Sequence, residues 1–98
     1  MQKCIESTMW GKNLNYEYLL WIYHQAVRLG LKGITFSKSD GSIKVIAEGE
    51  EKNLLFFTKK LKRGCFLHHF FNPVENFCVK WQEPRNEFED FSISEARE

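Results

Sequence analysis

An Asp-Gly pair between two β-rich runs, with a helical pattern on each side, limits the fold of this chain more than any other feature. Asp40-Gly41 divides residues 32–50 into a hairpin, because Asp-Gly is a preferred two-residue connection between antiparallel strands. Residues 16–29 before it and 51–63 after it place apolar side chains at helical spacing. The chain is therefore expected to alternate helices and strands around a central hairpin.

Three further strand patterns complete the predicted fold. Residues 3–10 and 74–81 alternate apolar and polar side chains, and residues 87–93 form a short final strand. The order lets each helix cross from one strand to a parallel strand two positions away. This predicts an α+β, ferredoxin-like split βαβ sandwich, an antiparallel sheet with two helices on one face. No linker is visible, so we expect residues 1–98 to form a single domain with a polar tail at about 94–98.

The charge and cysteine content argue against several classes of protein. A net charge of +1 is too small to steer the chain onto nucleic acid or an anionic membrane, so we expect neither as a partner. No apolar run suits a signal peptide or a spanning helix, from which we infer a cytoplasmic protein. Cys4, Cys65 and Cys78 are odd in number and far apart, which favours free thiols. His68 and His69 lack a third ligand at metal-binding spacing, so we expect no metal and no cofactor.

Short motifs run in order along the chain and together resemble the acylphosphatase family. "AVRLGLKG" resembles the family's helix end A-x-x-L-G-L-x-G, and "SDGSIKVIAEGE" resembles its D-G hairpin followed by A-E-G. "LKRG" and "FEDFSI" are similar to the end of the second helix and to the closing strand. The matching residues are Ala26, Leu29, Gly30, Leu31, Gly33, Asp40, Gly41, Ala47, Glu48 and Gly49. The resemblance covers nearly the whole chain and implies the fold that the element order predicts.

The resemblance also implies where catalysis would take place. Acylphosphatases hydrolyse carboxyl-phosphate anhydrides with a loop, G-x-V-Q-G-V-x-F-R, between the first strand and the first helix. In that family the loop N–H groups bind the phosphate, its Arg clamps the phosphate oxygens, and an Asn before the D-G turn positions the water. Counting back without gaps from "LGL", the phosphate-binding loop falls on Lys12, Asn13, Leu14, Asn15, Tyr16, Glu17 and Tyr18.

Both side chains that the resemblance makes catalytic are replaced. The Arg position holds Leu19, which has no hydrogen-bond donor, and the Asn position holds Ser37, whose hydroxyl reaches less far than an amide. Glu17 adds a negative charge beside the loop, where it repels a phosphate, stabilises the helix start, or does both. Lys12 is the cation nearest to the loop in the sequence, but a flexible ammonium is a poor copy of a fixed guanidinium fork.

Three functional hypotheses remain open. The first is an acylphosphatase-like domain that is catalytically degenerate and acts as a binding or structural module, with a small anionic ligand as one candidate partner. The second is an active acylphosphatase with a rearranged site. The third is a homodimeric interaction domain that uses its edge strand or the aromatic segment containing Phe66, Phe70 and Phe71, a segment that alternatively covers the edge of the core.

Overall fold

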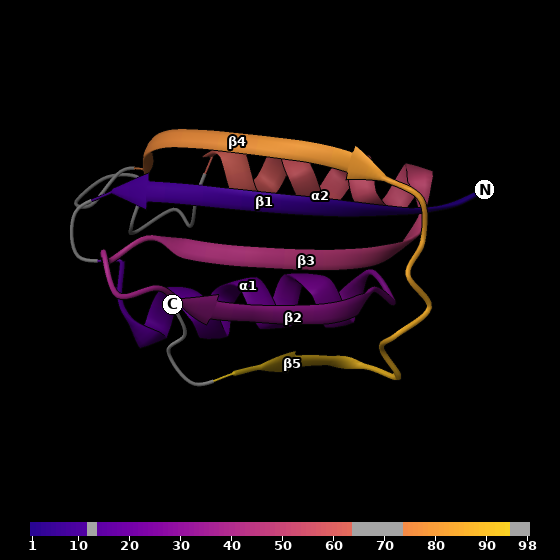
Figure 1. Cartoon of the computed structure of the whole chain (residues 1–98), viewed down its shortest axis with the longest axis horizontal. Helices are drawn as coiled ribbons and strands as arrows, with labels where there is room; N and C mark the ends of the chain where they lie inside the picture. Colours follow the sequence, from indigo (N-terminus) through magenta and orange to yellow (C-terminus); the bar gives the residue numbers. More distant parts are fainter. Residues whose placement is uncertain (12–13, 64–73, 95–98) are drawn as a thin grey trace.

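The fold is a five-stranded sheet with two helices, seen in a computed structural model that describes residues 1–11, 14–63 and 74–94. The strands lie side by side in the order β4-β1-β3-β2-β5 (Figure 1). The elements are, in chain order, β1 (Gln2–Gly11), α1 (Tyr16–Arg28), β2 (Lys32–Ser37), β3 (Ile43–Glu50), α2 (Glu51–Arg63), β4 (Val74–Gln82) and β5 (Phe91–Ile93).

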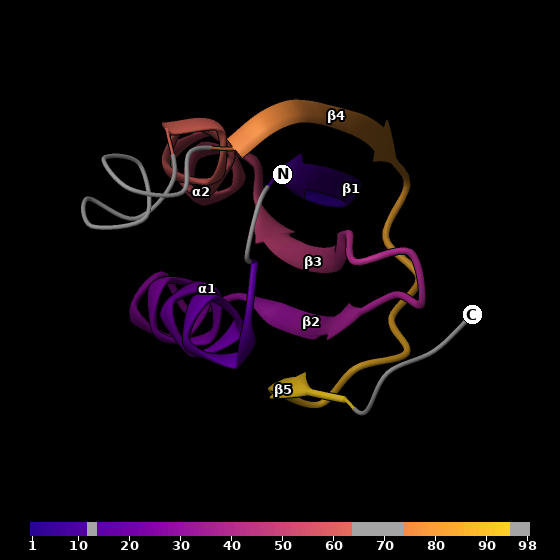
Figure 2. The ribbon, with the colours of Figure 1, turned by 90° about the vertical axis from the view of Figure 1, so that its left-hand side faces the viewer.

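Both helices cross over a neighbouring strand, as the element order predicts. β1 pairs antiparallel with β3 and with β4, and β2 pairs antiparallel with β3. The connection through α1 therefore passes over β3, and the connection through α2 passes over β1. Seen along the strands, both helices cover the same face of the sheet, and the other face carries no helix (Figure 2). The split βαβ prediction is confirmed.

The fifth strand differs from the predicted antiparallel sheet in direction and in length. β5 pairs parallel with β2, with Gly33 opposite Phe91 and Thr35 opposite Ile93, and it spans three residues. β4 runs antiparallel to β2, and the chain turns back once in residues 83–90, so β5 runs in the direction of β2. Periodicity in the sequence indicates a strand but not its partner, which is why the sheet is mixed where a wholly antiparallel one was expected.

The hydrophobic core lies between the sheet and the two helices. α1 contributes Leu19, Ile22 and Ala26 to it, at the spacing of one helix face. The other buried apolar residues of helices and strands that form this cluster are Ile5, Met9, Tyr18, Ile43, Val45, Ala47, Leu54, Phe57, Leu61 and Phe91. Because the core is continuous from β1 to β5, it fixes the position of both helix starts relative to the strand ends.

Candidate functional site

The structure brings the predicted catalytic positions to one edge of the sheet. β1 and β2 are parallel and end at the same edge, where α1 also begins (Figure 1). Leu19 lies in the first turns of α1, and Ser37 is the last residue of β2. Lys12 and Asn13 lie outside the described residues, so the candidate site is described through residues 14–19 and Ser37.

Asn15 closes the start of α1 with its own side chain. Its Oδ1 accepts a hydrogen bond from the backbone N–H of Tyr18 at 3.3 Å, and its carbonyl oxygen accepts from Tyr18 and Leu19 at 3.0 and 3.2 Å. This confirms the predicted N-cap. The N–H groups of residues 18 and 19 therefore have internal acceptors, although helix starts are otherwise good sites for anions. Glu17 is exposed in the same turn, where its charge complements the helix dipole.

The loop and the first turns of α1 turn large apolar groups inward. Leu14 is buried, the Tyr18 side chain is fully buried in the core, and its ring packs edge-on against Trp21 with centroids 5.4 Å apart. Tyr16 is exposed. Residues 14–19 carry one charged side chain, the carboxylate of Glu17. A phosphate at this place meets aromatic and aliphatic carbon and one negative charge from the described part of the loop.

Leu19 is part of the core and not of an exposed anion site. Only 4% of its surface is accessible, and it shares the buried stripe of α1 with Ile22 and Ala26. A leucine at this position contributes to packing between α1 and the sheet. It supplies no donor to any oxyanion held at the loop.

Ser37 lies on the helix-covered face of the sheet, at the end of β2. Its partner across the pair is Ile43, and Ile43 pairs in turn with Met9 of β1. Both neighbours are fully buried, whereas Ser37 is partly exposed at the edge. Its hydroxyl therefore faces the side on which α1 begins, which is the side required for an interaction with a water or an anion at the loop.

A network of charged side chains lies on the opposite, helix-free face. Lys44 Nζ contacts Glu6 Oε2 at 2.7 Å, and the Gln82 amide donates to Glu6 Oε1 at 3.0 Å. These partners, Lys44 first, hold the pKa of the Glu6 carboxyl below its usual range against the effect of its burial. Since the sheet separates this network from α1, it adds no positive charge to the candidate site.

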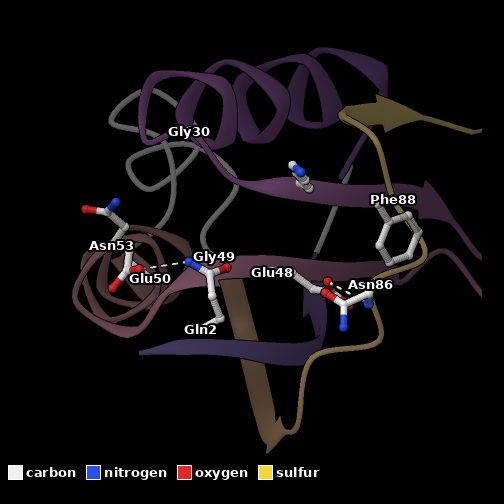
Figure 3. A pocket seen from close by; sticks show the side chains of 9 residues that line it. Gln2, Gly30, Glu48, Gly49, Glu50, Asn53, Asn86 and Phe88 are labelled. Atoms are coloured by element: carbon white, nitrogen blue, oxygen red, sulfur yellow. Dashed lines mark hydrogen bonds between the residues drawn. The ribbon is translucent and has the colours of Figure 1, made fainter.

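Glu48 fixes the connection between β4 and β5 on that same face. Its side chain is 5% exposed, and its two oxygens accept the backbone N–H groups of Arg85 at 2.6 Å and Asn86 at 3.2 Å. Asn86 has a positive φ of 58°, which a helix or strand does not allow. The carboxylate thus holds a turn of the chain against the sheet (Figure 3).

A hollow of about 450 Å³ lies beside Glu48, at the end of the sheet away from the predicted loop (Figure 3). It is bordered by the end of β3 and by the start of β1. The carboxylate of Glu50 accepts there from the amino terminus of Met1 at 2.9 Å and from the Gln2 amide at 2.8 Å. Two carboxylates with internal partners and one lysine, Lys32, line it, so the hollow does not favour a phosphate.

Comparisons with known proteins place this fold and these motifs in one family. The family model for acylphosphatase matches residues 6–93. The chain belongs to the acylphosphatase family. It is similar to an acylphosphatase of Caldanaerobacter subterraneus subsp. tengcongensis, at 31% identity over 83 residues that cover 85% of this chain and 83% of that protein. An acylphosphatase of Dehalococcoides mccartyi is 33% identical over 91 residues, 92% of this chain and 96% of that protein.

A solved structure gives the same result for the fold. The crystal structure of acylphosphatase from Bacillus subtilis superposes with a TM-score of 0.83, covering 96% of this chain and 99% of that chain at 22% identity. The acylphosphatase fold is therefore present from β1 to β5.

The residues that match the acylphosphatase pattern have steric or backbone roles in this structure. Gly33 has a φ of 150°, and a Cβ atom there would collide with the carbonyl oxygen of Ile46. Gly30 follows the last turn of α1 with a φ of 69°, as the predicted C′ residue does. Glu48 holds the β4–β5 connection. The sequence pattern included Glu48 without indicating this role, because its two partners become neighbours only through the tertiary fold.

The remaining sequence predictions concern thiols, metal and membrane. Burial, followed by the charge of Glu48, raises the pKa of the Cys4 thiol to about 11, while Cys78 is free and exposed. Cys65, His68 and His69 lie outside the described residues. Within the described ranges, no three His, Cys, Asp or Glu side chains are grouped to hold a metal ion. None of the helices seen in those ranges is long and apolar enough to cross a membrane.

Proposed function

We propose that this member of the acylphosphatase family hydrolyses acyl phosphates far more slowly than its fold allows, and that it acts as a binding or structural module. The observation that carries the proposal is Leu19, which occupies the position of the family's phosphate-clamping Arg and is buried in the core. A transition state that develops negative charge needs donors already aimed at it. Removing one such donor costs about 3 kcal/mol, roughly a few hundred-fold in rate.

Two further features support the same proposal. Asn15 supplies internal acceptors to the N–H groups of residues 18 and 19, which reduces the number of donors that the helix start offers to a phosphate. Glu17 places a carboxylate in the first turn of α1, where it repels an incoming dianion. Ser37 keeps a hydroxyl at the position of the water-positioning Asn, but a single donor there cannot replace the missing cation.

The alternative is an active acylphosphatase with a rearranged site. It is supported by the two bacterial relatives, which are named acylphosphatases and match this chain over most of its length. In this case Lys12 is the candidate cation, because the loop of residues 14–18 supplies none.

Hydrolysis of benzoyl phosphate separates the two functions. The proposal predicts that the wild-type chain and the Ser37→Ala variant both hydrolyse it at the buffer rate. An enzymatic rate that the wild-type chain shows, and that Ser37→Ala or Lys12→Gln removes, would contradict the proposal and identify the rearranged site.

A second experiment asks whether the scaffold still supports the chemistry. The pair Leu19→Arg with Ser37→Asn restores both side chains of the family pattern, and Leu19→Gln with Ser37→Asn is the matched control without the positive charge. We expect hydrolysis to rise only in the Arg pair. Circular dichroism of each variant checks folding, because residue 19 is buried and an arginine there destabilises the core.

A homodimer is the second candidate function, and the position of β4 favours it. β4 spans nine residues at the edge of the sheet, with β1 as its one partner strand among the described residues. Such an edge is a template for pairing with another strand. Phe66, Phe70 and Phe71 lie outside the described residues, so the proposal rests on the strand alone. Size-exclusion chromatography at increasing concentration is expected to show a dimer, and a monomer throughout would contradict this candidate.

A further inference from the structure

α2 presents two different faces, and its outward face combines positive charge with exposed apolar side chains. The inward face packs Leu54, Phe57 and Leu61 into the core. Five exposed cations lie on the rest of the helix, namely Lys52, Lys59, Lys60, Lys62 and Arg63. Between them, Leu55 and Phe56 are 48% and 57% exposed. We call these seven residues the α2 outer face.

The spacing arranges these side chains in rows along the helix. Residues 52, 56, 59 and 63 follow one another at intervals of four, three and four, which places them along one line of an α-helix. Phe56 is therefore flanked along the helix by Lys52 and Lys59. None of the five cations forms an ion pair with a residue that the structure describes, whereas Lys3, Lys44 and Arg85 all do.

The charge of the molecule is divided between two opposite sides. α2 carries a net +4, and because the whole chain carries +1, the remainder carries −3. Residues 83–90, with four acidic side chains and Arg85, also carry −3 and run along the helix-free side of the sheet (Figure 2). A negatively charged surface is therefore attracted to the α2 side and repelled from the opposite side.

We propose that the α2 outer face binds an anionic lipid surface, so that the protein lies on a membrane without crossing it. Clusters of four to eight Lys and Arg residues on an amphipathic helix are typical of contacts with acidic lipids, and α2 has five. Leu55 and Phe56 can enter the boundary between headgroups and acyl chains while the neighbouring ammonium groups stay at the headgroups.

The geometry favours a flat lipid surface over a peptide or a nucleic acid. The α2 outer face is the convex side of a helix, and two hollows that the described part of the chain forms beside α2 are lined by its first-turn residues Glu51 and Asn53 and by none of the seven. An extended peptide requires a groove. A single strand of nucleic acid requires several stacking aromatic rings, and this face has one, Phe56.

The expectation that the chain binds no membrane rested on its net charge as a whole. Exposed charges that lie more than a Debye length apart, about 10 Å at 0.1 M salt, are largely screened from each other, so contact with a surface is governed by the charges that face it and not by the net charge of the chain. The proposal replaces that expectation with a short-range contact through one face.

Sedimentation with vesicles tests the proposal. The purified chain is mixed with vesicles of phosphatidylcholine and phosphatidylserine in equal proportion, and separately with pure phosphatidylcholine vesicles. We expect binding to the first only, and weaker binding at high salt. Lys52→Gln with Lys59→Gln should weaken the partition about 30-fold, from about fivefold for each lysine near the surface. Phe56→Ser should weaken it about tenfold.

Matched controls keep the result specific to α2. Lys32→Gln with Lys80→Gln removes the same charge from exposed positions on the sheet, and Val27→Ser removes an exposed apolar side chain from α1. Both should bind like the wild type. Equal binding to the two kinds of vesicle, or an unchanged partition of the Lys52→Gln, Lys59→Gln variant, would overturn the proposal. Tighter binding to single-stranded DNA than to anionic vesicles, lost in the same variant, would overturn the lipid assignment in favour of nucleic acid.

Discussion

Replacing Glu48 tests whether the buried carboxylate holds the β4–β5 connection on the sheet. Its two oxygens accept the N–H groups of Arg85 and Asn86 at 2.6 and 3.2 Å, from a side chain that is almost fully buried. Glu48→Gln keeps one accepting oxygen and turns an amide donor toward the other N–H. One charge-assisted hydrogen bond is lost and one buried donor is left without an acceptor.

The expected loss of stability follows from these two effects. A hydrogen bond to a charged group contributes about 1.5–3 kcal/mol, and a buried unsatisfied donor costs about 1–3 kcal/mol. Because relaxation of the 83–90 segment restores part of this, we expect Glu48→Gln to lower the free energy of unfolding by about 2–3 kcal/mol. For a domain of this size, that lowers Tm by roughly 10–20 °C.

Glu50→Gln is the matched control on the same strand. Glu50 is exposed and pairs with the amino terminus of Met1, and an exposed ion pair contributes little to stability because water and salt screen it. Urea denaturation followed by circular dichroism measures both variants, and the slope with urea should stay unchanged. If Glu48→Gln destabilises the protein no more than Glu50→Gln, the carboxylate does not hold the connection.

Three other predictions follow from single contacts. Gly33→Ala should lower the free energy of unfolding by about 3 kcal/mol or more, since a Cβ there collides with the carbonyl of Ile46, and a near-neutral effect in urea denaturation would contradict this. The lowered pKa of Glu6 stabilises the folded state above the unfolded glutamate pKa, and this is lost as the pH falls through the folded pKa. The stability difference between wild type and Lys44→Met should therefore shrink in acid, and a difference that grows there would refute the assignment. Iodoacetamide at mildly alkaline pH should label Cys78 and spare Cys4 in peptide mass spectra, because the Cys4 pKa is about 11; equal labelling in the folded protein would be the contrary result.

The sequence predicts the elements well because their boundaries depend on local chemistry. Asn15 is the N-cap, Gly30 follows α1 in a left-handed conformation, and α2 begins at Glu51, as the pattern indicates. Features that depend on distant neighbours could not be predicted in this way. The parallel pairing of β5 and the two hydrogen bonds to Glu48 both arise from where residues 83–90 cross the sheet.

The candidate site shows the same division between local and distant causes. The position of Leu19 in the buried stripe follows from helical spacing and is confirmed. Tyr18 is counted with the loop by resemblance, yet its ring lies fully in the core, where it contacts Trp21. Which side of a loop residue faces a ligand depends on packing against other elements, and neighbours along the chain do not determine it.

Residue 19 is a point at which stability and phosphate chemistry oppose each other. As leucine it buries nearly all of its side chain between α1 and the sheet, which stabilises the fold by about 1.5–3 kcal/mol relative to an exposed position. As arginine it could supply the missing charge only by moving out of the core toward the loop, which forfeits that packing. We therefore expect Leu19→Arg alone to lower the free energy of unfolding and inorganic phosphate to recover part of the loss, because an anion that binds the folded state stabilises it by mass action. Thermal denaturation with and without phosphate measures this, with Leu19→Gln as the control. An equal response of both variants to phosphate would mean that the loop does not bind the anion through residue 19.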